Sequence, residues 1–138
     1  MAIYTKSKEY RLLGQKVLRE NEDLHWIRDA KIRIGYLSCD NDKKLPGERL
    51  VYGECRKVPD LYRAYIPYDF LVIFYWPNVS LMTDEQQEIL MHHELLHVGM
   101  EPSGKLYVVP HDIEDFYSII EKHGLDWGGL KAGEPDGS

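Results

Sequence analysis

Residues 69–76 restrict the fold most, because they are almost wholly apolar and rich in β-branched and aromatic side chains (DFLVIFYW). A short run of this kind, ended at once by Pro77 and Asn78, predicts a strand in the interior of a sheet, covered on both faces. The rest of the chain must therefore supply neighbouring strands and covering layers for this segment.

Helical and strand patterns follow one another along the rest of the chain. Ser7 is a candidate N-cap for a first helix, and Thr83 with Gln86 forms a capping box that begins a second one. Gly99 is the expected C′ residue of this second helix. The predicted elements are helices over 7–21, 83 to about 98 and 112–124, strands over 31–37, 49–58, 69–76 and 105–109, and a polar loop over 39–47.

The length and the order of the elements indicate one domain. A chain of 138 residues is the size of a single domain and buries roughly two-thirds of its unfolded surface on folding. The order α-β-β-β-α-β-α predicts an α+β fold. We expect this domain over residues 1–127 and a flexible, glycine-rich tail over 128–138.

Charge and composition argue against several classes of partner. Lys and Arg number 17 against 23 Asp and Glu, and the net charge of −6 disfavours binding to nucleic acid or to anionic membranes. No apolar run reaches the roughly 18 residues of a membrane-spanning helix, and the N-terminus lacks the pattern of a secretory signal. Cys39 and Cys55 are expected to be reduced thiols, as is typical of a cytoplasmic protein.

Residues 93–97 (HELLH) form an HExxH motif within the second predicted helix. Residues four positions apart share one face of a helix, so His93 and His97 can bind one Zn²⁺ at roughly 2.0–2.1 Å. Glu94 lies one position further round, where it can take a proton from a zinc-bound water but is badly placed to bind the metal. The apolar residues of the segment fall on the other side, which we expect to pack on the sheet.

A catalytic zinc usually has three protein ligands and a water, so the motif needs a further ligand. His111 is the predicted third ligand, because the 13 residues between it and His97 allow a turn, a short strand and a return to the site. Alternatively, His111 is an exposed residue at the start of the last helix. The rival third ligands are then the carboxylates of Glu101, Asp112, Glu114 and Asp115.

The other histidines are interpreted without a metal. His92 is predicted to project away from the metal side as a buried, hydrogen-bonded histidine. His25 and His123 are expected at the surface or at helix ends. Tyr107 and Tyr117 lie nearest the motif in sequence, and neither is assigned as a donor to a substrate carbonyl.

The segment HHELLHVG, a short strand, HDIEDF and a following Gly-Leu-Asp-Trp together resemble the putative phage metallopeptidase family over about residues 30–127. The chain is more distantly similar to SprT-like and other minimal zincins. The resemblance implies a zincin-like α+β fold, in which the HExxH helix packs on a small twisted sheet. It implies His93, His97 and His111 as zinc ligands and Glu94 as general base, in a phage or prophage protein of the bacterial cytoplasm.

The leading hypothesis is a zinc-dependent metallopeptidase that hydrolyses peptide or protein substrates. Met100 and Ser103 stand where a metzincin has its glycine and third histidine, so the chain is not a metzincin. The strand over 49–58 is the predicted sheet edge for an extended substrate. The alternatives are a zincin-fold binding or regulatory protein that holds zinc without peptidase activity, and an accidental motif in a structural protein. The sequence predicts neither the oligomeric state nor the cleavage specificity.

Overall fold

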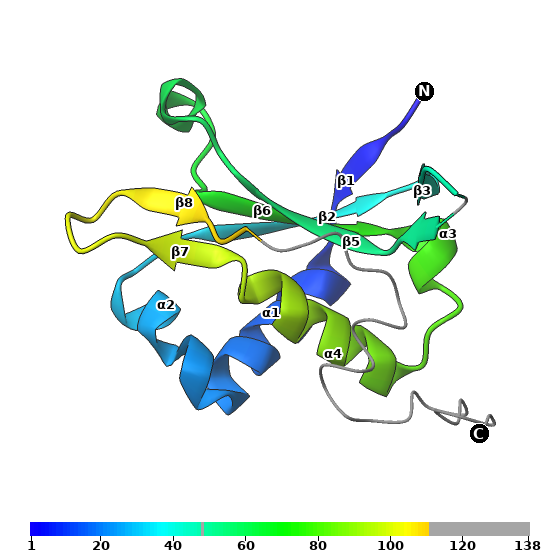
Figure 1. Cartoon of the computed structure of the whole chain (residues 1–138), viewed down its shortest axis with the longest axis horizontal. Helices are drawn as coiled ribbons and strands as arrows, with labels where there is room; N and C mark the ends of the chain where they lie inside the picture. The colour runs from blue at the N-terminus through cyan, green and yellow to red at the C-terminus, as the bar shows by residue number, and fades with distance from the viewer. Residues whose placement is uncertain (48, 111–138) are drawn as a thin grey trace.

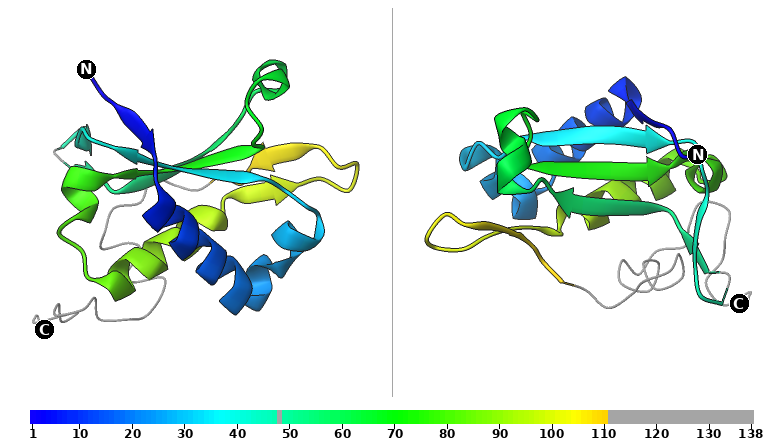
Figure 2. Two further views of the ribbon diagram at one scale, coloured as in Figure 1. Left: turned by 180° about the vertical axis from the view of Figure 1, so that it is seen from behind. Right: turned by 90° about the horizontal axis from the view of Figure 1, so that it is seen from above.

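The computed structural model describes residues 1–47 and 49–110, which form a mixed α+β fold. The two longest described helices, α1 (Lys8–Glu20) and α4 (Asp84–Leu95), lie side by side against one face of a sheet (Figure 1). Figure 2 shows the same two layers from behind and from above. Within the described residues no helix is long and apolar enough to cross a membrane.

The described elements divide into a main sheet, two hairpins and the covering helices. The strands are β1 (Tyr4–Lys6), β2 (Ile34–Cys39), β3 (Lys43–Leu45), β4 (Arg49–Val51), β5 (Gly53–Lys57), β6 (Phe70–Tyr75), β7 (Val98–Met100) and β8 (Leu106–Val108). Besides α1 and α4, the helical segments are η1 (Glu22–Leu24), α2 (His25–Asp29), η2 (Asp60–Ala64) and α3 (Trp76–Val79). The main sheet has the order β1-β2-β6-β5, and β3-β4 and β7-β8 pair separately. Strand β2 is parallel to β6, whereas β1 and β5 are antiparallel to their neighbours.

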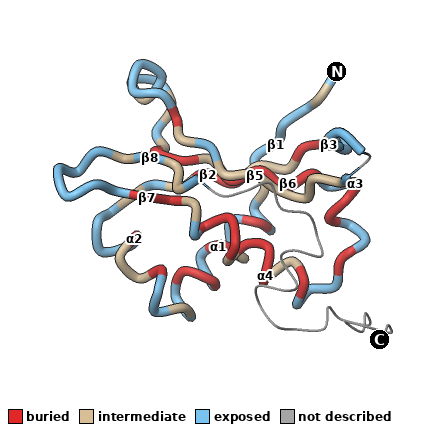
Figure 3. The backbone as a smooth tube through the Cα atoms, in the orientation of Figure 1, coloured by how far each residue is buried: buried red, intermediate tan, exposed pale blue. Residues whose placement is uncertain are grey.

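Strand β6 lies between β2 and β5, and the predicted interior strand is thereby confirmed. Phe70 and Phe74 are fully buried in the core that the sheet forms with α1 and α4. Ile73 and Tyr75 are buried on the opposite face, where they pack with Cys39. Figure 3 shows this burial as a red path along the middle of the sheet and the inner side of α4. Because both faces of β6 are covered, its sequence is apolar at nearly every position.

Both predicted helix starts in the described chain are confirmed. The side chain of Ser7 accepts a hydrogen bond from the N–H of Tyr10 at 3.1 Å. The N–H of Gln86 donates to Oγ1 of Thr83 at 3.2 Å, and the N–H of Thr83 donates to Oε1 of Gln86 at 2.8 Å. These bonds satisfy N–H groups that have no partner inside a helix, so each helix begins at its cap.

The predicted end of the second helix is wrong. The helix ends at Leu95 instead of about Val98, and Leu96 is its C-cap. Gly99 is not a C′ residue but lies in β7, which pairs with β8. A Cβ atom at Gly99 would lie 2.7 Å from the ring of Tyr107, so any larger residue there would displace this ring. Strand pairing with distant residues overrides the local helical pattern here.

The boundaries of the first predicted strand differ from the expectation of 31–37. Strand β2 begins at Ile34 and ends at Cys39. Lys31 has a φ of 58°, in the left-handed region, and it ends the turn after α2 rather than starting a strand. The helix predicted over 112–124 lies outside the described residues.

The region from residue 39 to residue 58 contains more strands than predicted. The single strand expected over 49–58 is divided at Tyr52 into β4 and β5, which belong to different sheets. The loop expected over 39–47 contains β3, which pairs with β4 as a hairpin. Asn78 holds this hairpin against the sheet by donating to the carbonyls of Lys43 and Val51 at 3.3 and 2.8 Å.

Candidate metal centre

The last turn of α4 carries the first two residues of the HExxH motif. His93 and Glu94 are each only 5% exposed. Helix α4 packs against β5 at the edge of the described main sheet (Figure 1), and the Glu94 carboxylate lies beside Gly53 of that strand. Burial of two polar side chains requires partners for them, which is typical of a functional site rather than of a simple core.

His97 follows the helix instead of lying within it. Its backbone N–H donates to the carbonyl of Glu94 at 3.1 Å, in the tight turn that closes α4. The rings of His93 and His97 are 5.1 Å apart between centroids and meet edge to face, at 89°. An imidazole centroid lies about 3 Å from a zinc ion bound to its nitrogen, so two rings at this separation can share one ion.

The end of β8 determines how the ring of His97 is oriented. Nδ1 of His97 lies 2.9 Å from the carbonyl oxygen of Val109, and because a carbonyl only accepts, Nδ1 must donate. In the neutral ring, Nε2 is then left as the unprotonated nitrogen that a metal requires. The N–H of Val109 donates in return to the carbonyl of His97 at 2.6 Å, so the two residues are held together at both backbone and side chain.

Glu94 faces β5 at a position that has no side chain. A Cβ atom at Gly53 would lie 3.3 Å from Oε2 of Glu94 and 3.2 Å from the ring of Phe74. Burial, and then the negative charge of Glu94, raise the pKa of the nearby Cys55 thiol. Glu94 therefore lies between α4 and β5, beside the strand edge that the sequence predicts as the substrate edge.

His92 lies on the other side of α4, as predicted. Its Nε2 is 2.9 Å from Oδ2 of Asp23. The prediction of a hydrogen-bonded histidine is confirmed, but the side chain is 21% exposed rather than buried. His92 therefore serves as an internal comparison for the two histidines of the motif.

The described part of the chain brings together two of the predicted ligands. Among residues 1–47 and 49–110 no group of three His, Cys, Asp or Glu side chains is arranged to hold a metal ion. Glu101 is exposed in the turn between β7 and β8, where its N–H bonds the carbonyl of Lys105. The predicted third ligand His111, and its rivals Asp112, Glu114 and Asp115, lie outside the described residues.

Two contributors to the site were not found by reasoning from the sequence. The carbonyl of Val109 is a backbone group, and a sequence pattern carries no signal for it. Gly53 did carry a signal, because a glycine inside a predicted strand indicates a close approach by another group. That group is the carboxylate of Glu94.

Comparison with known proteins gives one match. The family described as "Putative phage metallopeptidase" matches residues 2–132, which is nearly the whole chain. No curated protein and no solved structure matches it.

Proposed function

The chain belongs to this phage metallopeptidase family, and we propose that it is a zinc-dependent peptidase with a single zincin-like domain over residues 1–127. The observation that carries the proposal is the pair His93 and His97, whose rings meet at 5.1 Å beside the buried carboxylate of Glu94. A buried carboxylate next to two histidines matches the general base and the ligands of a hydrolytic metal site. Free Cys39 and Cys55 support our proposal of action in the cytoplasm of a bacterial host.

We assign His93, His97 and His111 as the zinc ligands. His97 supports this assignment because its bond to the Val109 carbonyl leaves Nε2 free of a proton. His111 is two residues beyond Val109, and two residues span at most about 7 Å, so it is within reach of the same ion. Three imidazole nitrogens form a donor set that zinc accepts.

Glu94 is the proposed general base. Zinc, when bound, supplies a Lewis acid and lowers the pKa of water toward about 7. The Glu94 carboxylate then takes a proton from the attacking water and passes it to the leaving amine. Its place against β5 holds it in a site from which bulk water is largely excluded, since only 5% of the residue is exposed.

The substrate class follows from the strand beside the helix. Strand β5 is the last strand of the described main sheet, and its residue Gly53 lies next to Glu94. An extended peptide can add to such an edge through backbone hydrogen bonds, which would bring one carbonyl close to Glu94. We therefore propose an unfolded or extended polypeptide segment as the substrate.

The test compares metal content and cleavage in four proteins. Wild type should hold about one zinc per chain and cleave a quenched peptide library. Glu94→Gln should keep its zinc and lose about 10²- to 10⁴-fold in rate. His111→Ala should lose zinc, and His92→Ala, the matched histidine control, should retain both properties.

Other outcomes contradict separate parts of the proposal. Undiminished zinc in His111→Ala would remove that residue as a ligand. Full activity in Glu94→Gln would remove the general base. Zinc without any cleavage of peptides or proteins would favour a binding or regulatory zincin instead.

A further inference from the structure

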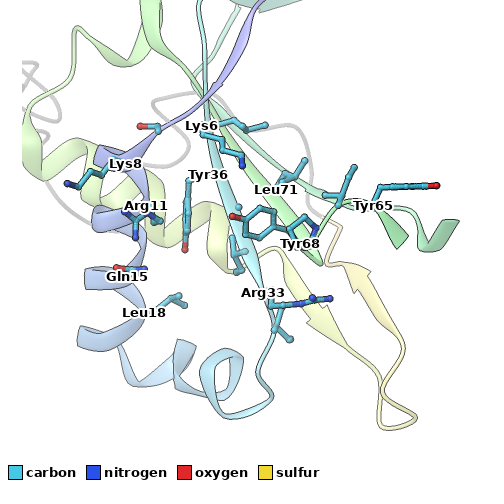
Figure 4. Close-up of a pocket in the computed structure, with 17 residues that line it drawn as sticks. Lys6, Lys8, Arg11, Gln15, Leu18, Arg33, Tyr36, Tyr65, Tyr68 and Leu71 are labelled. Atoms are coloured by element: carbon cyan, nitrogen blue, oxygen red, sulfur yellow. The ribbon is translucent and has the colours of Figure 1, made fainter. Parts of the chain in front are cut away.

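A second concave site lies at the β2 edge of the sheet, whereas the helix that carries the motif packs against β5. It is a groove of about 880 Å³ between α1, β2 and the loop that precedes β6. Figure 4 shows Arg11 and Gln15 of α1 on one side of it, Tyr36 in the middle, and Tyr68 on the other side. None of the residues of the HExxH motif lines it. The groove is therefore independent of the proposed zinc site.

The walls of this groove are basic. Lys6, Lys8, Arg11 and Arg33 line it, and no Asp or Glu is among its described lining residues. Arg33 also contacts Asp69 at 3.4 Å, whereas none of the ion pairs among the described residues includes Lys6, Lys8 or Arg11. In a chain whose net charge is −6, this concentration of positive charge creates a local field that attracts carboxylates.

The groove also contains an open strand edge. Strand β1 pairs only with Leu37–Cys39, and the chain leaves the sheet after Ser7, whose N–H bonds the carbonyl of Tyr36 at 3.0 Å. The carbonyl of Arg33 points toward β6, so by the alternation of a strand the N–H and C=O of Ile34 point the other way. On the side of β2 away from β6, no described strand pairs with it at Ile34, because β1 reaches only from Leu37 to Cys39. A donor and an acceptor are therefore presented side by side at the base of the basic groove.

We propose that this groove binds an extended, carboxylate-rich segment of a partner protein, which adds as a short strand to β2 at Ile34. The acidic side chains of the segment lie against Lys6, Lys8 and Arg11. Tyr65, which is 94% exposed, and Tyr68 flank the groove. In the proposed complex their rings pack against the apolar side chains of the bound segment. A peptide fits better than a nucleic acid, because its backbone matches the donor and acceptor of Ile34.

The test uses fluorescence anisotropy with a labelled peptide of about nine residues that alternates glutamate with valine. The full-length protein is studied with and without a zinc chelator, together with the Glu94→Gln variant. The charge-reversal variant is Lys8→Glu with Arg11→Glu. Both residues are exposed and lie in the first turn of α1, where acidic side chains favour the helix, so this variant is expected to fold. The matched control reverses two exposed charges away from the groove, Arg19→Glu with Arg28→Glu.

We expect the acidic peptide to bind wild type and Glu94→Gln equally, with or without chelator, and to bind more weakly at high salt. The charge-reversal variant should lose about tenfold or more in affinity, and the matched control less than about twofold. A version of the peptide methylated at alternate backbone nitrogens should also bind more weakly, because it cannot complete the strand.

Each contrary result overturns the proposal. One such result is that wild type does not bind the acidic peptide. Another is that the charge-reversal variant binds it with the same affinity as wild type. A third is that wild type binds a lysine–valine peptide as tightly as the acidic one. Tighter binding of single-stranded DNA through the same residues would replace the peptide with a nucleic acid. The binding assay needs neither zinc nor Glu94, so a failure to bind the acidic peptide does not contradict the peptidase proposal. Equally, a lack of zinc or of peptidase activity does not contradict the proposed peptide groove.

Discussion

Gly53 and Glu94 show how closely one backbone position constrains a candidate catalytic group. A Cβ atom at residue 53 would lie 3.3 Å from Oε2, which is tighter than an ordinary contact, so the carboxylate would have to move by a few tenths of an ångström. A larger residue on β5 must push the carboxylate, the ring of Phe74, or both. The position of the proposed base is thus determined from the sheet as well as from the helix.

Gly53→Val is expected to impair cleavage without removing zinc. The added methyl groups displace the Glu94 carboxylate, and a misplacement of about 1 Å can cost on the order of 100-fold in rate. Peptide cleavage should fall by about 10- to 100-fold, with Gly53→Ala between this variant and wild type. Metal content and melting temperature, measured on the same samples, separate this effect from unfolding. Wild-type rates in Gly53→Val would contradict the assigned position of the carboxylate.

Glu54, the neighbour of Gly53, points to the other face of the sheet and forms a charged cluster there. It accepts hydrogen bonds from Lys43 and Tyr75, and from Nε of Arg56 at 2.8 Å. Burial acts to raise the pKa of Glu54, but the hydrogen bonds from Arg56, Lys43 and Tyr75 outweigh it and lower this pKa to about 2. The charged form of Glu54 is therefore favoured by folding.

The pH dependence of stability follows from the sign of this shift. The pKa of Glu54 is lower in the folded state than its ordinary value of 4.5, so its contribution is fully present above about pH 4.5 and is lost toward pH 2. Glu54→Gln should lower the free energy of unfolding by about 1–2 kcal/mol at pH 7. Urea unfolding at pH 7 and pH 3 measures the gap between the two proteins, which should narrow at pH 3. A gap that widens on acidification would contradict the cluster.

At the scale of elements, α4 is determined locally at its start and by distant residues at its end. Thr83 and Gln86 are three residues apart and complete the capping box by themselves. The other end depends on the segment after β8. There the N–H of Val109 donates to the carbonyl of His97, and the carbonyl of Val109 accepts from the ring of His97. This difference explains why the start of the helix was predicted correctly and its last turn was not.

Thr83→Ala is expected to lower the free energy of unfolding by about 1 kcal/mol, because an N–H of the first turn loses its acceptor. Zinc content should be unchanged, since the cap lies at the opposite end of α4 from His93. Ser80→Ala is the matched control, because the exposed Ser80 hydroxyl donates to the Pro77 carbonyl at the end of α3 and not to the first turn of α4. Chemical denaturation measures both variants. Equal losses of stability would argue that the capping box contributes nothing particular.

At the scale of the whole molecule, the proposed zinc site and the basic groove lie on the two sides of the layer of helices. Helix α4 packs against β5, whereas α1 packs against β2 and forms a wall of the groove. The contact between α1 and α4 joins the two regions through the core. Zinc bound between α4 and the end of β8 would therefore stabilise the fold as well as supply the chemistry.

Zinc removal is expected to lower the melting temperature of the wild type. A metal that binds only the folded state at a hundredfold above its dissociation constant adds about 3 kcal/mol, equivalent to a shift of about 10 °C. Calorimetry with and without a chelator measures the shift, and added zinc should reverse it. His93→Ala should melt at the same temperature in both conditions. A wild type that loses its zinc with no change in melting temperature would contradict a site that joins α4 to β8.

Local patterns were sufficient for the features that depend on neighbouring residues. The apolar run over 69–76 predicted the interior strand, and the residues of both caps predicted two helix starts. Each of these features depends on interactions within a few residues or on simple burial. The sequence pattern of polar and apolar residues is sufficient to recognise both kinds of interaction.

Only the tertiary structure decided where the chain pairs with itself. It ended α4 at Leu95, divided the strand expected over 49–58 at Tyr52, and brought the Val109 carbonyl to His97. Backbone hydrogen bonds between distant segments carry no side-chain signature, and their partners are chosen by the whole core rather than by local preference. For the same reason the open edge of β2 appears only when the sheet is assembled.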